Sequence, residues 1–353
     1  MKIVFQSLLL FVFTNPFLLS QNSEYLSTSE VFSILQKSKL SYNILPMDKL
    51  SSSEIKEYTQ NLYMKESQHV EYPWVVNNEN GISLTEFKFD SLAWTEILKG
   101  EEFYSEKDYE NALKYYEEAI NKSDNCYLGY LNAGDCYLEL NNPEKALDYY
   151  EKAKKINPYD YRCYFYCGTA NMQLEKYEEA KDNYIYALSL KPNHPNLLLV
   201  LNKLSSLLSI TVKDITFNPV GGINGNGNTI DVYIKMEDEG VWMPYILTKA
   251  MLKYEKEERM KYVGTDSTQW SMEEEKQALY CMLSSYNSMK EDGKVSENEY
   301  LEKLTKMFKD GDWGKFIIYE IASNMSPDVV LLMPEEFRAE IESFIRKYVI
   351  IDS

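Results

Sequence analysis

The side chains in this sequence that could do chemistry are few and scattered. The two histidines, His69 and His194, lie far apart, and neither belongs to a serine–histidine–aspartate pattern. No GxSxG, Walker or GxGxxG sequence occurs. Carboxylates are abundant, but on amphipathic helices they form the solvated face, and nothing singles out an acid and base pair. We therefore predict no catalytic residue, no cofactor and no enzyme, although an activity within residues 209–353 stays open.

One short stretch invites a metal hypothesis. The sequence "DGKVSENEY" resembles the second half of an EF-hand calcium loop, with a glycine at the bend and Glu299 as the closing ligand. The first and third ligand positions fall on Ser288 and Lys290, whereas calcium needs six to eight oxygens. We interpret the stretch as a helix connection in which Ser296 and Glu299 form a capping box, and we predict no metal site.

The charge of the chain excludes some partners. It has 353 residues, 44% of them hydrophobic, with 55 acidic against 37 basic residues and a net charge of −18. A field of this sign repels phosphate backbones and anionic lipid. Nucleic acid is therefore not expected as a partner.

The N-terminus has the layout of a secretory signal peptide. Residues 1–20 place Lys2 before an apolar run that ends in a small residue, and a polar stretch follows. An uncleaved anchor is the alternative, but Gln6, Asn15 and Pro16 make the run a poor membrane span. We predict an exported protein, periplasmic or extracellular, that is soluble after cleavage and is not an integral membrane protein.

Small and aromatic residues recur every 34 residues in the middle of the chain. The recurring positions are Gly100, Gly134 and Gly168; Ala112, Ala146 and Ala180; Ala119, Ala153 and Ala187; and Tyr116, Tyr150 and Tyr184. This pattern resembles the tetratricopeptide repeat (TPR) family, in which each unit is a helix, a turn and an antiparallel helix. The resemblance covers residues 93–194 as repeats 93–126, 127–160 and 161–194, and a capping helix is expected at 195–208.

The repeat pattern has a packing explanation. Helices that cross closely need small residues where their backbones approach, so we expect Gly134 to face Ala146, with a tyrosine filling the space beside them. Pro158 and Pro192 end the second helices of repeats two and three, because proline has no amide donor. Each pair buries only part of its apolar surface, so the units must stack into a short superhelix.

The cysteines fit this packing. Cys136 and Cys167 occupy small and core positions of the family register, while Cys126 and Cys163 fall near the starts of adjacent first helices. A disulfide between Cys126 and Cys163 is one alternative, limited by the spacing of the helices. Neither CxxC nor a histidine pair is present, so no zinc site is expected.

The resemblance also implies a binding surface. In the family, the first helix of each repeat lines an inner groove that receives peptides or partner helices. By register, this groove is lined by Trp94, Ile97, Glu101, Tyr104, Leu128, Leu131, Asp135, Leu138, Arg162, Phe165, Thr169 and Met172. The set is mostly apolar and lacks the lysine, arginine and asparagine cluster that clamps C-terminal carboxylates in peptide-binding members, which disfavours a receptor for chaperone tails.

An apolar groove should be covered by something. Either the chain covers it, with amphipathic stretches at 29–42 and 54–66 or with its C-terminal domain, or a segment of another exported protein docks there.

The flanks complete the expected architecture. Residues 21–92 read as a polar flank with two helices and a linker at "EYPWVVNNENG", and Ser51 with Glu54 marks a capping box. Residues 209–353 read as a small α+β domain: a hairpin from "SITVKDITF" and "NTIDVYIKM", separated by "NPVGGINGNG", and then about five helices. The helices are expected at 242–259, 272–290, 297–309, 314–324 and 335–349.

The sequence therefore predicts a mainly α protein: a three-repeat TPR superhelix with a capping helix and a small α+β domain. The predicted function is that of an exported, non-enzymatic scaffold that binds a protein segment in its groove, within a cell-envelope assembly. The alternative is a TPR docking arm attached to a C-terminal ligand-binding or hydrolase domain.

Overall fold

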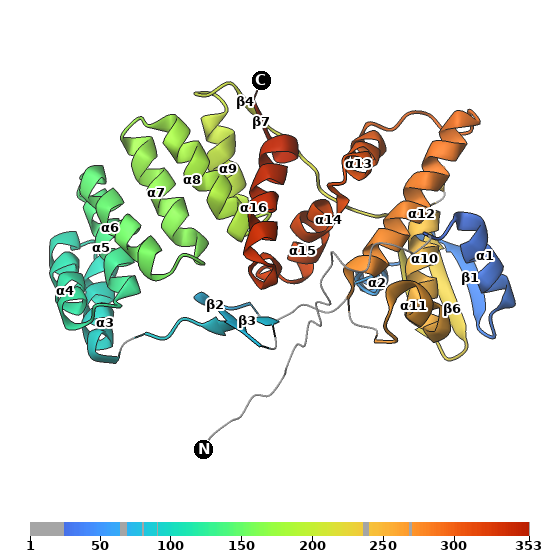
Figure 1. Ribbon diagram of the computed structural model, residues 1–353, viewed down its shortest axis with the longest axis horizontal. Coiled ribbons are helices and arrows are strands. Elements are labelled where there is room, and N and C mark those ends of the chain that lie inside the picture. Colours follow the sequence, from blue (N-terminus) through green and yellow to red (C-terminus); the bar gives the residue numbers. More distant parts are fainter. Residues whose placement is uncertain are drawn as a thin grey trace, which may run out of the picture.

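The computed structural model describes residues 25–63, 69–79, 81–89, 91–235, 240–267 and 270–352. Within them the fold is mainly helical. Figure 1 shows a curved stack of helix pairs on one side of the molecule and a mixed domain of helices and strands on the other. The last helices of the chain lie between the two, against the end of the stack. The predicted signal peptide falls outside the described residues.

The stack consists of three helical hairpins and a capping helix, as predicted. The pairs are α3 (Ser91–Ser105) with α4 (Tyr109–Lys122), α5 (Tyr127–Glu139) with α6 (Pro143–Ile156), and α7 (Tyr161–Gln173) with α8 (Tyr177–Leu190); α9 (Pro195–Leu204) follows. The turn inside each hairpin repeats the same backbone geometry. Lys107, Asn141 and Glu175 occupy equivalent positions and all have a positive φ. Asp108 and Asn142 then cap the second helices by accepting from backbone amides.

Each repeat glycine lies directly against a tyrosine ring. A Cβ added at Gly134 would come within 2.5 Å of the Tyr150 ring, and Gly100 and Gly168 have the same relation to Tyr116 and Tyr184. The tyrosine that we expected beside the helix crossing thus lies directly against the glycine. The missing Cβ makes room for an aromatic ring, which fills the crossing more completely than a methyl group would.

The strands differ from the predicted hairpin. In the three-stranded sheet, β6 (Thr229–Ile234) pairs with β5 (Gly221–Asn226) on one side and with β1 (Ser41–Pro46) on the other. The expected first strand instead supplies β4 (Ile210–Val212), which pairs with β7 (Ile350–Asp352) at the end of the chain. The glycine and asparagine stretch expected to separate the two strands of the hairpin is itself a strand, β5. Its glycines permit close packing, since a Cβ at Gly222 would lie 2.7 Å from the backbone of Tyr58.

The N-terminal flank packs on the C-terminal domain. Helices α1 (Thr28–Lys37) and α2 (Ser52–Gln60) both begin with a capping box, and the box of Ser51 and Glu54 is the predicted one. A short 3-10 turn, η1 (Met47–Lys49), separates β1 from α2. The Thr59 hydroxyl, at the end of α2, donates to the carbonyl of Gly221 at 2.9 Å. These helices therefore do not cover the groove of the repeats.

The expected linker before the repeats is a β-hairpin. Strands β2 (Pro73–Asn78) and β3 (Gly81–Glu86) pair antiparallel and lie along one edge of the stack (Figure 1). Trp74 of β2 makes edge contacts with Phe87 and with Tyr159 of the repeats. The apolar residues of this segment thus form a strand that packs on the array.

The remaining helices follow the prediction with two changes. They are α10 (Met243–Tyr254), α11 (Lys256–Val263), α12 (Met272–Glu291), α13 (Glu299–Lys309), α14 (Trp313–Phe316), α15 (Ser323–Met325) and α16 (Glu335–Phe344), with π-helical turns η3 (Ile317–Ala322) and η5 (Ile345–Val349) and a 3-10 turn η4 (Val329–Leu332). The helix expected at 242–259 is interrupted at Glu255. The cap of α13 is Asn298, so the capping box predicted at Ser296 was wrong.

One hydrophobic core joins the end of the array to the C-terminal domain. It includes Tyr184 and Leu188 of α8 and Leu201 of α9, together with Phe316 and Ile345. A second core fills the first two and a half repeats. The C-terminal domain therefore stabilises the array by continuing its stacking, in the way a terminal cap does.

All five cysteines are buried and free, so the alternative of a Cys126–Cys163 disulfide does not hold. The Cys163 sulfur lies 3.7 Å from the Tyr127 hydroxyl oxygen instead. Among the described residues, no helix is long and apolar enough to cross a membrane.

Candidate functional site: the groove of the repeat array

The first helices of the repeats and the capping helix enclose an open groove with a volume of about 390 Å³. Its lining residues come from α3, α5, α7, α8 and α9: Tyr104, Asp135, Leu138, Glu139, Phe165, Tyr166, Thr169, Met172, Tyr184, Val200 and Lys203. The volume lies within the range of roughly 300–1,000 Å³ typical of ligand pockets.

The structure brings together one part of the predicted lining. Tyr104, Asp135, Leu138, Phe165, Thr169 and Met172 all face this groove. Sequence reasoning missed Glu139, Tyr166 and Tyr184, of which the first two adjoin predicted positions and the third is a repeat tyrosine. It also missed Val200 and Lys203, whose helix was expected only to cap the array.

The other predicted residues lie elsewhere. Trp94, Ile97 and Leu128 line a separate pocket of only about 10 Å³ beside Phe89. Leu131 is 4% exposed and belongs to the core of the array. An aspartate at Leu131 would therefore test folding and not binding.

Glu101 is exposed and accepts a hydrogen bond from the side-chain amide of Asn132 on the next repeat. It does not line the groove, but its charge acts on Asp135.

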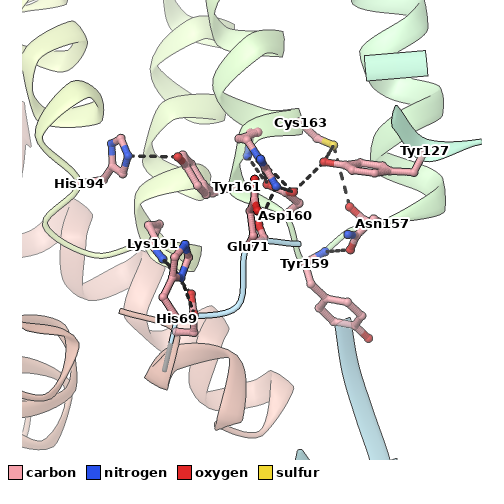
Figure 2. Close-up of polar contacts among 12 residues, drawn as sticks. His69, Glu71, Tyr127, Asn157, Tyr159, Asp160, Tyr161, Cys163, Lys191 and His194 are labelled. Carbon is pink, nitrogen blue, oxygen red and sulfur yellow. Dashed lines mark hydrogen bonds and ion pairs between the residues drawn. The ribbon is translucent and has the colours of Figure 1, made fainter. Parts of the chain in front are cut away.

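Arg162 is withdrawn from the groove into a polar cluster at the repeat ends. Its guanidinium forms an ion pair with Asp160 and stacks on the ring of Tyr72, 4.2 Å from the ring centre. It also donates to the backbone carbonyl of Glu71 at 2.7 Å. Figure 2 shows Glu71 beside Asp160, which accepts a further hydrogen bond from Tyr127. Arg162 thus holds the segment that leads into β2.

Both histidines have structural contacts near this cluster (Figure 2). His69 Nδ1 lies 2.9 Å from a carboxylate oxygen of Asp328, and Lys191 lies 2.8 Å from the other oxygen. Burial raises the pKa of Asp328, but the Lys191 ammonium outweighs it and holds that pKa below its usual value. His194 shares a 3.1 Å hydrogen bond with Tyr161, and burial lowers its pKa.

The groove itself is acidic at its floor. The pKa of Asp135 is raised to about 7: burial raises it most, the charges of Glu101 and Glu139 also raise it, and a hydrogen bond from Tyr150 acts against them. The Tyr150 hydroxyl donates to Asp135 Oδ1 at 2.6 Å. In the part of the chain that the structure describes, no lysine or arginine forms an ion pair with Asp135.

A buried ionic cluster in the C-terminal domain is the other concentration of charge. Lys249 contacts both Glu274 and Glu275, Arg259 contacts Glu274 at 2.5 Å, and Tyr245 donates to Glu275. Burial raises the pKa of Glu275, and its neighbour Glu274 raises it further. Every charge in the cluster has a partner, and none of the cluster residues lines the two cavities described above, so the removal of one partner would leave a buried charge uncompensated.

The described residues contain no group of histidine, cysteine, aspartate and glutamate side chains arranged to hold a metal ion. In the stretch that resembles an EF-hand, Asp292 pairs with Lys294 at 2.8 Å, and Glu299 pairs with Lys303. Both carboxylates are thus paired with lysines, although a calcium ion would need them as ligands.

Comparison with known families identifies the array. Residues 97–161 and residues 161–194 each match the family described as the tetratricopeptide repeat. Residues 97–194 are therefore a TPR segment, a class of protein-interaction module. No curated protein matches the chain.

Solved structures similar to the array cover about a third of this chain. The first TPR of Spaghetti (RPAP3) bound to the HSP90 peptide SRMEEVD is 24% identical, covers 34% of this chain and 94% of that one, and has a TM-score of 0.33. The Arabidopsis OM64 TPR domain is 26% identical over 33% and 97%, also with a TM-score of 0.33. The second TPR domain of human RPAP3, in complex with the HSP70 peptide SGPTIEEVD, is 26% identical over 32% and 95%, with a TM-score of 0.32.

Proposed function

We propose that this protein is a non-enzymatic scaffold whose repeat groove binds a peptide or helical segment of a partner protein. The observation that carries the proposal is the open groove of about 390 Å³, to which all three repeats and the capping helix contribute side chains. The amphipathic helices of the N-terminal flank pack on the C-terminal domain and leave the groove open.

The chemistry of the lining supports a protein segment as ligand. Leu138, Phe165 and Met172 offer half-buried apolar surface, while Thr169 and the tyrosines offer hydroxyls at its margin. Interfaces that bind peptides combine a few apolar anchors with such polar groups. A ligand that covered these side chains would remove their apolar area from water, which favours binding by about 25 cal/mol for each Å² buried.

We further propose that the protein is exported and acts in a cell-envelope assembly. The support is the apolar run of residues 1–20 behind Lys2. N-terminal sequencing of the protein isolated from its own cells tests export. We expect the mature chain to begin near residue 21, and a chain that retains Met1 in the cytosolic fraction would contradict the proposal.

Photocrosslinking in the native cells tests the docking role. A benzoyl-phenylalanine in place of Phe165 should crosslink to a discrete partner protein, which mass spectrometry then identifies. The same residue at Met260, which is 50% exposed on α11 and remote from the groove, is the control position. Equal crosslinking from both positions would contradict a groove-specific partner.

A matched pair of substitutions completes the test. Met172→Asp places a charge in the groove, whereas Met260→Asp places the same charge on the C-terminal domain. We expect the first variant to lose at least tenfold in affinity for the identified partner, and the second to bind like the natural protein. Thermal unfolding of both variants checks that the array stays folded.

A further inference from the structure

We propose that the bound segment carries a lysine or arginine whose positive charge pairs with Asp135 at the floor of the groove. This inference rests on the proposed docking function and specifies the chemistry of the partner: a short segment with one cationic side chain flanked by apolar ones. It is carried by the position of Asp135 and by the charges and rings around it.

Asp135 is held in place by a neutral hydroxyl and not by a cation. It lies in the middle of α5 next to Gly134, and the Tyr150 hydroxyl holds its Oδ1 from the second helix of the same repeat. Among the described residues no cation forms an ion pair with it, although the carboxylate faces a cavity large enough for a ligand. An ionised carboxylate in a recessed site gains most from a partner that supplies the missing charge.

The charges around Asp135 add to this preference. Glu139 lines the same groove one turn along α5, and the charge of Glu101 on α3 reaches Asp135 as well. Lys203, on α9, is the one lysine or arginine among the residues that line the groove. The groove thus complements a cation, and a peptide that ended in a free carboxylate would meet repulsion on entry.

The aromatic side chains of the groove suit a cationic side chain too. Tyr104, Phe165 and Tyr166 come from α3 and α7 and line the cavity on both sides of α5. A lysine or arginine can lie over such rings while its charge reaches the carboxylate. Elsewhere in the array the chain pairs its own lysines with tyrosines in this way, as Lys152 does with Tyr149 at 4.9 Å.

Binding of a cation should be linked to a proton. The pKa of Asp135 is raised to about 7, so part of the population holds a proton at neutral pH, and a cation must displace it. Affinity for a cationic segment should therefore rise between pH 6 and pH 8. The other titratable or charged groups that act on Asp135 or line its groove are Tyr104 and Glu101 on α3, Tyr116 on α4, Cys136 and Glu139 on α5, Tyr150 on α6, Tyr166 on α7, Tyr184 on α8 and Lys203 on α9.

The test uses a displayed library of random 12-residue peptides, selected at pH 8 on the full chain and counter-selected on the Met172→Asp variant. We expect the enriched peptides to share a lysine or arginine between apolar residues. The best lysine peptide and its norleucine analogue are then titrated against the natural protein and against Asp135→Asn.

A double-mutant cycle gives the decisive result. Replacing lysine by norleucine should weaken binding to the natural protein at least tenfold, and it should make little difference to Asp135→Asn, which keeps the acceptor for Tyr150. Asp148→Asn, an exposed charge on α6 that pairs with Lys152, is the matched control and should leave the difference intact.

The other outcomes separate the two proposals. Groove-dependent peptides without a cation, or additive effects in the cycle, would overturn the pairing with Asp135 and leave docking in place. Peptides that bind the natural chain and Met172→Asp equally would overturn groove docking as well.

Discussion

The repeat array and the C-terminal domain are held together by contacts of different range. In the array, each of the three glycines that recur every 34 residues meets a tyrosine sixteen residues later in its own hairpin. In the C-terminal domain, β1 pairs with β6 so that Asn43 bonds to Asp231, 188 residues away. The array is thus assembled from neighbours in sequence, and the domain from distant parts of the chain.

This difference indicates which side chains specify the structure of each region. The array is defined by small residues and rings at a fixed spacing, and its polar side chains remain available to line a groove. The domain buries a complete ionic cluster around Lys249 and uses it to hold α10, α11 and α12 together. A substitution in the array should therefore destabilise mainly its own repeat, with the same effect at the equivalent position of each repeat. A substitution in the domain should destabilise segments that lie far apart in the sequence.

The largest effect is expected at Lys249. Lys249→Met removes the cation between Glu274 and Glu275 and leaves a buried carboxylate unpaired, which should cost about 3–5 kcal/mol. Hydrogen exchange should show lost protection in α10 and α12 with α4 to α6 still protected. Lys276→Met, which removes a partly exposed pair with Glu273, should cost less than about 1 kcal/mol. Uniform loss of protection across both regions would break the comparison.

The second largest effect on stability is expected at the interface between the array and the C-terminal domain. Burial raises the pKa of Glu320 to about 7, against hydrogen bonds from Phe217 and Asn193 that lower it. Because the folded state holds this proton more tightly than the unfolded chain, the stabilisation is complete below about pH 4.5 and is lost as the pH rises through about 7.

In chemical unfolding, Glu320 should therefore contribute about 2–3 kcal/mol to a fall in stability between pH 4.5 and pH 8, and Asp135, whose pKa is raised in the same way, should contribute a similar amount, so that Glu320→Gln removes about half of the fall that the two groups cause. Glu342→Gln, which alters a surface pair with Arg346, should keep the slope of the natural protein. If the unfolding free energy of Glu320→Gln depended on pH as in the natural protein, groups other than Glu320 would be responsible for the pH dependence.

The third prediction compares glycines. Gly134→Ala drives a Cβ into the Tyr150 ring and should cost about 1–3 kcal/mol by overpacking. Gly314→Ala in α14 has no atom nearer than 3.8 Å to the new methyl group, so it should be neutral or stabilise the protein by up to about 1 kcal/mol. Unfolding free energies measure both. Similar costs at the two positions would remove the distinction between a repeat glycine and an ordinary helical one.

The smallest effect is expected at the hairpin on the array. Arg162→Lys keeps the charge but loses the planar contact with Tyr72 and the paired hydrogen bonds to Asp160, which should cost about 1 kcal/mol. Hydrogen exchange should rise in β2 and β3 and stay unchanged in α12. Arg346→Lys, at a more exposed pair with Asp182, is the matched control.

The local features of the array follow from sequence. The spacing of Gly100, Gly134 and Gly168 predicts three hairpins because each repeat closes its own contacts, and the register of the first helices predicts positions such as Leu138 and Phe165 that do line the groove. Ser51 and Glu54 predict their helix start for the same reason, since both hydrogen bonds lie within one turn.

Only the tertiary structure decided the contacts between distant segments. The strand at Ser41–Pro46 carries no mark of its partner β6, and the hairpin at residues 73–86 carries none of the repeat ends on which it packs. Arg162 occupies a groove position in the repeat register, yet its contacts with Asp160 and Tyr72 hold its side chain away from the groove. Asp135 is one carboxylate among many in the sequence, and its raised pKa arises from burial by the surrounding helices. Periodic sequence specifies contacts that close within a repeat, whereas pairing across the chain depends on which surfaces remain to be buried once the local units have formed.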